Sequence, residues 1–396
     1  MKRNTFVVIA AVLGSVVSCD TLDDFIGNPG DNGDKEVNFN YRSTIQVGGE
    51  GASEISAFCS KTHKLFVVNV EINEISVFDI SDVDAPQKLN SITLDGGAPN
   101  SVAVSQGKLA VAIEGTVKQD PGTIAVYNTA DHSWLGSYPT GALPDMVTFS
   151  PNGNYIVSAN EGEPNDDYTV DPRGSVTIVT LSNGNISTLY FDAFNGDEAI
   201  LENQGFRVFG PNANLAMDVE PEYIAISDDS QTAWVALQEN NGLAKVDLTT
   251  KRITDIYPLG FKDYGEVGNG IDPSNKDDKT VLRNVPVFGM YQPDGITYLE
   301  VGGIGYVVSA NEGDSREYEG TPGYVGEERI KDIVLDPTAF PDADELQENG
   351  NLGRLKIALS EGDPDGDGDY DRLYSYGARS FSIWSGNGQL VYDSGN

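Results

Sequence analysis

An internal repeat constrains the fold of this chain more than any other feature of its sequence. Four segments begin with proline and a short polar residue and then alternate apolar positions: residues 99–105, 144–150, 221–227 and 293–298. This alternation is typical of a β-strand. The shortest spacing between two of them, from Pro99 to Pro144, is 45 residues. That length suits one small β unit, so the chain is expected to place several similar units side by side rather than form one sandwich.

Three further strands follow the first one in each unit. The second strand ends at a glutamate, which is Glu114, Glu161, Glu239 or Glu312 in the four units. A third strand carries its apolar alternation into Asp or Asn, as in residues 124–128, and a fourth closes the unit. Four antiparallel strands in about 45 residues are typical of a β-propeller blade of the WD40 or YVTN kind.

The repeat also allows the blades to be counted. They are predicted at residues 54–94, 99–139, 144–195, 221–260 and 293–360, with another that begins at residues 379–384. A strand predicted over residues 40–47 is expected to complete the last blade, because propellers often close with strands from both termini. We therefore expect an all-β fold, a propeller of six to seven four-stranded antiparallel blades that spans residues 38–396 with incomplete closure.

The N-terminus carries the signals of export and lipid attachment. Two basic residues precede an apolar run over residues 6–17, which is too short for a permanent membrane span. The run ends in small residues before Cys19, the arrangement that a lipoprotein signal peptidase recognises. We expect residues 1–18 to be a lipoprotein signal peptide, Cys19 to be lipidated, and residues 19–37 to be a flexible acidic tether. An ordinary secretory signal with an incidental cysteine is the alternative.

Charge and cysteine content exclude several kinds of site. The chain has 61 acidic and 25 basic residues, a formal net charge of −36, which attracts cations and repels nucleic acid. Its two cysteines are Cys19 and Cys59, so lipidation of Cys19 leaves no pair for a disulfide. Two histidines are too few for a histidine-rich metal site. The expected partners are a membrane, through the lipid anchor, and an unidentified ligand or surface protein.

Several motifs resemble the choice-of-anchor I family. They are Ser-Ala-Asn-Glu-Gly at residues 158–162 and 309–313, the segments 351–355 and 376–384, and the aspartate-rich segment 362–371. The resemblance covers nearly all of the chain after the tether. It implies a propeller attached outside the cell, here by lipid to the bacterial outer membrane or cell surface. Some members are labelled mesenchyme-specific cell surface glycoprotein or atypical alkaline phosphatase, and the resemblance implies no established reaction.

The resemblance also bears on the C-terminus. Family members generally continue past residues 393–396 into further blade sequence, so this chain is expected to be a truncated member.

The topology of the blades predicts where a site would lie. The start of strand one, the end of strand two and the start of strand three share one end of an antiparallel blade. Long insertions join strands at that end too, at residues 162–174, 185–220, 261–292 and 313–352. Oxygen ligands without histidine or thiolate suit Ca²⁺, or another divalent cation such as Mg²⁺. The predicted ligands are Asp145, Asn160, Glu161, Glu222, Glu239, Asp294, Asn311 and Glu312.

The alternative for each of these residues is a structural role. Polar residues after proline and at strand ends often bond neighbouring backbone in turns. The sequence leaves this alternative open for any single residue of the set.

A second cation site is predicted in an aspartate-rich loop that resembles the first half of an EF-hand loop. The twelfth position is Tyr374 rather than glutamate, so the bidentate ligand of an EF-hand is missing. Five like charges so close together repel without a counterion, which favours a structural calcium ion over a bare acidic turn. The predicted ligands are Asp363, Asp365, Asp367, Asp369 and Asp371.

The sequence is compatible with two functions. A surface binding module, whose acidic face recruits cations and a glycan or protein, needs the fewest assumptions. A metal-dependent phosphoesterase would hold its metal with Glu161 and Glu312. Its Asp294 would activate water, and Arg316 or Arg379 would hold the phosphoryl group. In an acidic protein, however, arginines more often pair with local carboxylates.

Overall fold

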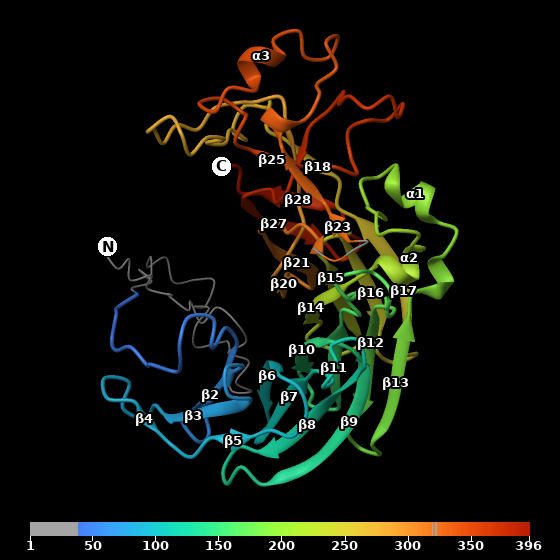
Figure 1. The fold of residues 1–396 in the computed structure, drawn as a ribbon. Helices are drawn as coiled ribbons and strands as arrows, with labels where there is room; N and C mark the ends of the chain where they lie inside the picture. The colour runs from blue at the N-terminus through green and yellow to red at the C-terminus, as the bar shows by residue number, and fades with distance from the viewer. Residues whose placement is uncertain (1–38, 319, 321–322) are drawn as a thin grey trace.

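The computed structural model describes residues 39–318, 320 and 323–396, so the predicted leader, Cys19 and the tether lie outside the described residues. The described chain is mainly β-structure, and its larger sheets follow one another along an arc (Figure 1). Its longest described helix, α1 (Glu198–Glu202), has five residues, and none of the described helices could span a membrane.

The first four predicted blades are confirmed by four consecutive sheets. Blade 1 contains β1 (Ser56–Cys59), β2 (Lys64–Asn69), β3 (Glu74–Asp79) and a split fourth strand, β4 (Gln87–Lys88) and β5 (Ile92–Thr93). Blade 2 contains β6 (Pro99–Ser105), β7 (Lys108–Ile113), β8 (Pro121–Asn128) and β9 (Trp134–Ala142). Blade 3 contains β10 (Pro144–Phe149), β11 (Tyr155–Asn160), β12 (Ser175–Thr180) and β13 (Asn185–Tyr190). Blade 4 contains β14 (Pro221–Ile226), β15 (Thr232–Leu237), β16 (Gly242–Asp247) and β17 (Arg252–Pro258).

The fifth blade corrects the predicted division of the C-terminal part. It contains β20 (Ile296–Val301), β21 (Ile304–Asn311), β27 (Ser380–Ser385) and β28 (Leu390–Asp393), all antiparallel. The prediction that residues 379–384 begin a new blade is wrong, because β27 pairs with β21 as the third strand of this one. Residues 312–379 are an insertion between its second and third strands. The described residues form five blades, so the predicted total of six to seven is not confirmed.

The segment before β1 packs on blade 1. Residues 40–47 form no strand. The Nε atom of Arg42 donates to Asp84 at 2.7 Å, and the Ser43 hydroxyl donates to the Val83 carbonyl at 2.7 Å. The prediction that this segment completes the last blade is therefore wrong, because these contacts hold it against blade 1. Within the described chain no strand pairs blade 1 with blade 5, and the arc of blades stays open (Figure 1).

The core lies between neighbouring blades. The first strands β1, β6, β10, β14 and β20 contact one another in this order, which places them around a common axis as in a propeller. Successive side chains of β7 point to opposite faces of the sheet. Leu109 packs in the core shared with blade 1, and Ala110 packs in the core shared with blade 3. The middle strands are therefore buried on both faces, and polar side chains are confined mainly to strand ends and loops.

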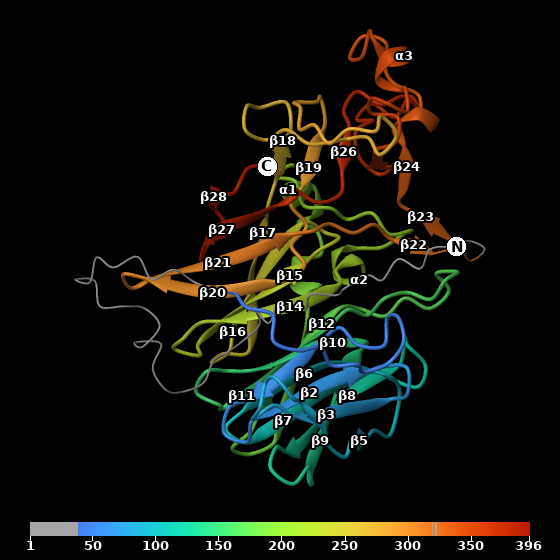
Figure 2. The ribbon, with the colours of Figure 1, turned by 90° about the vertical axis from the view of Figure 1, so that its left-hand side faces the viewer.

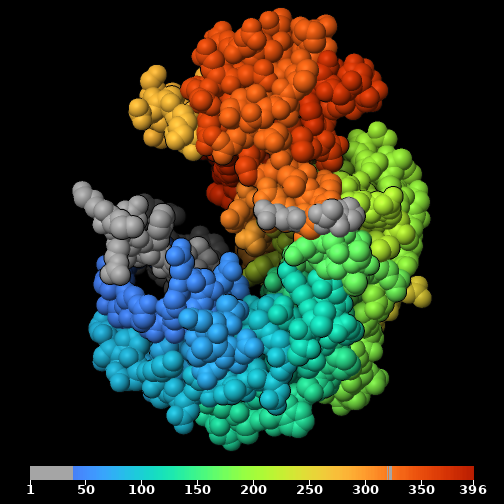
Figure 3. Space-filling view, viewed as in Figure 1, coloured from blue at the N-terminus to red at the C-terminus, as the bar shows by residue number. Residues whose placement is uncertain are grey.

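Two insertions come together in a cap, which we define as residues 261–290 and 324–375. The first insertion supplies β18 (Phe261–Asp263) and β19 (Phe288–Met290), and β19 pairs in parallel with β26 (Tyr374–Ser375) of the second. The second also forms β22 (Glu317–Tyr318), β23 (Tyr324–Val325), β24 (Glu327–Arg329), η3 (Ile330–Asp332), α3 (Ala343–Leu346) and β25 (Lys356–Ala358). Figures 2 and 3 show the cap beyond blade 5, at the far end of the arc from blades 1 to 3.

The cap has its own core and polar ties to blade 5. Side chains of both insertions, such as Val287 and Leu352, pack in one buried apolar cluster. Lys262 of β18 is buried and lies 2.8 Å from Asp393 of β28. A third insertion, between blades 3 and 4, holds η2 (Asp192–Phe194), α1 and α2 (Leu215–Asp218). Sequence patterns predicted these segments only as long loops.

Replacing a core leucine of the cap tests whether the cap has a packed core that contributes to the stability of the chain. Leu352 is fully buried, so Leu352→Ala should lower the free energy of unfolding by about 2–5 kcal/mol. Leu359→Ala is the matched control, because Leu359 is 38% exposed. Urea unfolding followed by tryptophan fluorescence measures both. Equal effects of the two substitutions would contradict a packed cap core.

Candidate functional site

The first Ser-Ala-Asn-Glu-Gly motif ends β11 with a buried hydrogen-bond network. The Asn160 amide donates to Thr177 Oγ1 at 3.0 Å and to Ser175 Oγ at 3.1 Å, both on β12. Its own oxygen accepts from the Ser158 hydroxyl at 3.1 Å. Asn160 therefore ties the second strand of blade 3 to the third.

The second motif repeats this network at the end of β21. The Asn311 amide donates to Ser380 Oγ at 3.0 Å and to Ser382 Oγ at 2.8 Å on β27, and its oxygen accepts from Ser309 at 2.7 Å. Both asparagines are buried and bonded within their blades. This geometry favours the structural alternative over cation ligation for Asn160 and Asn311.

The glycine of each motif lets the chain turn sharply after the glutamate. Gly162 and Gly313 have φ angles of 72° and 84°, in the left-handed region that favours glycine. A Cβ on Gly313 would lie 2.0 Å from the backbone nitrogen of Gly377. The turn leaves Glu161 and Glu312 at the ends of their strands, outside the ladders that bury the asparagines.

β-Bulges place the polar residues that follow the repeated prolines. The ladder of β10 and β11 skips Asp145, that of β14 and β15 skips Glu222, and that of β6 and β7 skips Asn100. A bulged residue is unpaired and its side chain leaves the regular alternation. The innermost strands can therefore offer acidic side chains at one end of the axis although their faces are buried.

The bulge and strand-end carboxylates interact strongly with one another. Burial raises the pKa of Asp145 to about 7, and the charges of Asp294 and Glu163 add to the rise. Burial also raises the pKa values of Glu161 and Glu222 well above the ordinary value, with neighbouring carboxylates contributing. We define the axial acidic cluster as the residues linked in this way: Asp145, Glu161, Glu163, Glu220, Glu222, Glu239, Asp294, Glu312 and Asp314.

Glu239 lies at the closed side of this cluster and Asp294 at its open side. Glu239 is only 7% exposed, its Oε2 atom has no hydrogen-bond partner among the described residues, and burial raises its pKa. Asp294 is exposed, yet desolvation and the nearby Glu312 carboxylate raise its pKa too. A buried carboxylate oxygen without a donor is unusual in a folded protein.

Sequence patterns missed part of this cluster. Glu163 and Asp314 occupy the same place, directly after the glycine of each Ser-Ala-Asn-Glu-Gly motif, and that repetition could have revealed them. Glu220 directly precedes the repeated proline of blade 4. Glu54 lies before β1 and is not a member of the cluster, but its charge also raises the pKa values of Asp145 and Asp294, and no repeated pattern marks it.

Arg316 supplies a buried positive charge beside the cluster. The side chain is 3% exposed. It donates to Asp218 Oδ1 at 3.0 Å, to Glu220 Oε2 at 3.1 Å and to the Asp218 carbonyl at 2.6 Å. Its guanidinium also lies 4.5 Å from the centre of the Phe209 ring. These contacts favour a role in positioning carboxylates over the predicted contact with a phosphoryl group.

Arg379 lies elsewhere. It directly precedes β27 and lines a cavity beside the cap, whose lining includes neither Asp294 nor Arg316. The structure therefore does not gather the three predicted catalytic residues around one cavity.

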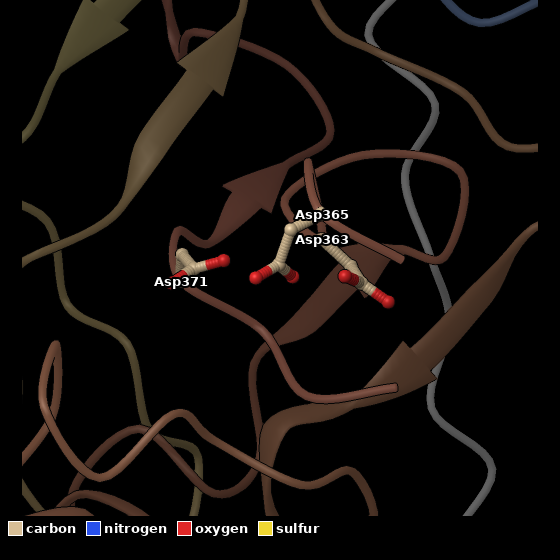
Figure 4. Close-up of side chains that lie close together, drawn as sticks. All are labelled: Asp363, Asp365 and Asp371. Atoms are coloured by element: carbon tan, nitrogen blue, oxygen red, sulfur yellow. The ribbon is translucent and has the colours of Figure 1, made fainter. Parts of the chain in front are cut away.

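The aspartate-rich loop brings three of its five predicted ligands together. Figure 4 shows Asp363, Asp365 and Asp371 facing one another, and one carboxylate oxygen from each lies within 4.8 Å of the others. Among the residues with described positions, no other group of three Asp, Glu, His or Cys side chains meets this criterion. The donor set consists of oxygen atoms only, which fits calcium.

Hydrogen bonds inside the loop hold Asp363 in place. Its carboxylate accepts from the backbone N–H of Gly366 at 2.8 Å and of Gly368 at 3.0 Å. Asp367 instead accepts from the backbone N–H of Asp369 at 3.2 Å, and neither aspartate joins the group of three.

Removing the Asn160 amide tests the structural role of the motif asparagine. Asn160→Ala leaves the buried Ser158 and Thr177 hydroxyls without this partner, so the free energy of unfolding should fall by about 1–3 kcal/mol. Asn154→Ala is the control, because the exposed Asn154 side chain makes none of these contacts. Urea unfolding measures both variants, and a loss no greater than that of the control would contradict the network.

The axial cluster predicts an unusual dependence of stability on pH. Seven of its carboxyls have raised pKa values in the folded state, so the folded chain binds more protons than the unfolded chain above the ordinary aspartate value of 3.8. Their stabilising effect is complete below the unfolded pKa and is lost as pH rises through the folded pKa, about 7 for Asp145. With a chelator present, stability should fall by about 1–3 kcal/mol between pH 5 and pH 7.

Amide variants provide the control for this pH profile. Glu222→Gln should flatten the decline, whereas Glu348→Gln, at an exposed position in the cap, should leave it unchanged. Thermal unfolding across the pH range measures the effect. A parent profile without a decline would contradict the coupled carboxylates.

Several solved structures are similar to this chain. One is a chain of a nidogen/laminin complex, which is 11% identical with a TM-score of 0.39 over 65% of this chain and 72% of that chain. Hydrazine synthase of Kuenenia stuttgartiensis is 15% identical with a TM-score of 0.36, over 64% and 80% of the two chains. The WD40 repeats of RRP9 are 11% identical with a TM-score of 0.40, over 70% and 65%. No curated protein matches significantly.

The sequence match to a protein family is more extensive. The choice-of-anchor I domain matches residues 54–396, which include all five blades, the cap and both Ser-Ala-Asn-Glu-Gly motifs. The match confirms the resemblance seen in the motifs. The chain therefore belongs to the choice-of-anchor I family, whose domain implies a surface-anchored extracellular protein.

Proposed function

We propose that this chain is a surface-attached binding module that holds a divalent cation in the axial acidic cluster and recruits a ligand or partner there. One observation carries the proposal: the carboxylate of Glu239 is buried, and its Oε2 atom has no hydrogen-bond partner among the described residues. It lies among carboxylates whose pKa values are raised by burial and by one another. A cation would neutralise this repulsion and supply the missing partner.

The chemistry of the cluster limits which ion fits. All ligand atoms are oxygens, which suits Ca²⁺ or Mg²⁺. Within the described part of the chain, no three cluster carboxylates bring oxygens within 4.8 Å of one another. An ion held there would keep water molecules in its coordination sphere, and an oxygen of an external ligand could replace one of them. Asp294 and Glu312 lie on the exposed side where such a ligand would approach.

The aspartate-rich loop is proposed as a second, structural calcium site. Asp363, Asp365 and Asp371 would hold the ion. The loop is tied to the cap by the backbone bonds between Tyr370 and residues 334 and 336. Calcium bound there would therefore stabilise the cap rather than take part in binding at the axis.

Attachment to the membrane is proposed to occur through a lipid on Cys19, with the tether of residues 19–37 between the membrane and the blades. The small residues before Cys19 and the family's surface attachment support this. It would hold the module at the bacterial outer membrane or cell surface.

The phosphoesterase alternative gains no support from the geometry. Arg316 donates to Asp218 and Glu220, and Arg379 lines a cavity that none of the axial acids lines. A phosphoryl group beside a metal in the axial cluster would therefore lack the predicted arginine contacts.

A calcium titration monitored by thermal unfolding tests the proposal. An ion that binds only the folded chain raises its stability, by about 2.7 kcal/mol at a concentration 100 times the dissociation constant. Glu239→Gln should raise the melting temperature without calcium and reduce the response to it, because the amide removes one repelling charge. Asp365→Asn should remove a separate part of the response, whereas Glu348→Gln should change neither.

The outcomes distinguish the two sites. One outcome is that calcium raises the melting temperature of Glu239→Gln as much as that of the parent but leaves that of Asp365→Asn unchanged. This result would show that calcium binds only in the aspartate-rich loop and would exclude the axial site. A parent chain without any response to calcium or magnesium would exclude both.

A further inference from the structure

A cavity of about 650 Å³ lies between the cap and the segment that leads into β27. Residues 272–275 of the first insertion line one side, and residues 354–356 and 375–376 of the second insertion line the other, with Arg379. Its size is that of small-molecule sites in proteins. None of the residues of the axial acidic cluster lines it.

The charge of this cavity is opposite to that of the whole chain. It is lined by four basic side chains, Lys279, Arg354, Lys356 and Arg379, and by two acidic ones, Asp272 and Glu327, which gives a net charge of +2. The chain as a whole has a formal net charge of −36. Such a local excess of positive charge favours an anionic ligand.

Within the described part of the chain, no carboxylate forms an ion pair with three of the four cations. Lys356 pairs with Glu327 across β24 and β25. Arg354 is half-buried, and its Nε atom donates to Asn275 Oδ1 at 3.2 Å, which leaves its two terminal nitrogens for a ligand. Arg379 and Lys279 have exposed side chains, and neither forms an ion pair among the described residues.

The backbone presents Arg379 in a fixed position. Its φ angle is 51°, in the left-handed region where residues other than glycine and asparagine are disfavoured. Its backbone N–H donates to the Asn311 carbonyl at 3.2 Å, and the next residue, Ser380, bonds the Asn311 side chain. The network that joins β21 to β27 therefore fixes the backbone from which the Arg379 side chain extends to the cavity.

The neutral lining is also ordered. The Tyr376 hydroxyl donates to the Gly326 carbonyl at 2.7 Å, and the Ser274 hydroxyl donates to the Asn349 carbonyl at 2.6 Å. These bonds tie residues from both insertions that line the cavity to the backbone of the cap.

We propose that this cavity binds a small molecule carrying a tetrahedral oxyanion, a phosphate or sulfate group, between Arg354 and Arg379. Guanidinium groups bind such groups with paired hydrogen bonds, which a carboxylate would use less fully because it has fewer oxygens and less charge. Lys279, an exposed residue of the lining, adds a third positive charge. This site is distinct from the axial acidic cluster and does not depend on a bound cation.

Isothermal titration calorimetry of the full chain tests this proposal. Inorganic phosphate and inorganic sulfate are titrated separately, with acetate as the carboxylate probe, at constant ionic strength and with a chelator present to remove divalent cations. We expect saturable binding of phosphate, sulfate or both. The anion that binds more tightly shows whether the natural ligand carries a phosphate or a sulfate group. Arg354→Gln and Arg379→Gln should each weaken binding about tenfold or more.

Two further variants make the result specific. Arg379→Lys keeps the charge but not the planar fork, so it should recover only part of the affinity. Arg252→Gln, at an exposed position on β17, should bind like the parent chain. The midpoint of urea unfolding shows that each variant is folded.

Three results would overturn the proposal. One is the absence of saturable phosphate and sulfate binding up to roughly 10 mM. Another is unchanged binding in both glutamine variants. The third is acetate binding as tightly as phosphate and sulfate, which would assign the cavity to carboxylates.

Discussion

Burial of both faces of the middle blade strands is the constraint on which the rest of this structure depends. Leu109 and Ala110 are neighbours in the chain, yet they pack in the cores of different blade pairs. A strand with two apolar faces has room for functional polar groups mainly at its ends or at bulges. The carboxylates of Asp145 and Glu161 occupy these two kinds of position, and one end of the axis becomes acidic as a result.

Buried hydrogen bonds allow that concentration of charge to exist in a folded chain. Asn160 and Asn311 fasten the second strand to the third directly before a glutamate, so the glutamate is held in place although like charges repel it. Arg316 partly balances the charge through Asp218 and Glu220. These groups come from two insertions far apart in the chain, and the ion pairs therefore join the two insertions to each other.

The cap adds a site of opposite charge to an acidic protein. It forms because the insertions after β17 and β21 share a core and a pair of parallel strands. That core places Arg354 close to the segment that leads into β27, where Arg379 lies. The proposed cation and oxyanion sites thus lie at different places around blade 5, and Asn311 and its neighbours at the join between β21 and β27 take part in positioning both.

The sequence by itself determined the blade repeat, the acidic end of the axis and the aspartate-rich loop, because period-two alternation and turn residues are local signals. It could not show that β27 returns to β21 after a long insertion, since strand pairing over that separation depends on packing and not on local pattern. It also could not distinguish the roles of two adjacent residues. Asn160 is a buried link between strands, whereas Glu161 belongs to the axial acidic cluster. Only the tertiary structure decided which polar groups have partners, because burial and distance between remote segments set their charge, their hydrogen bonds and their pKa values.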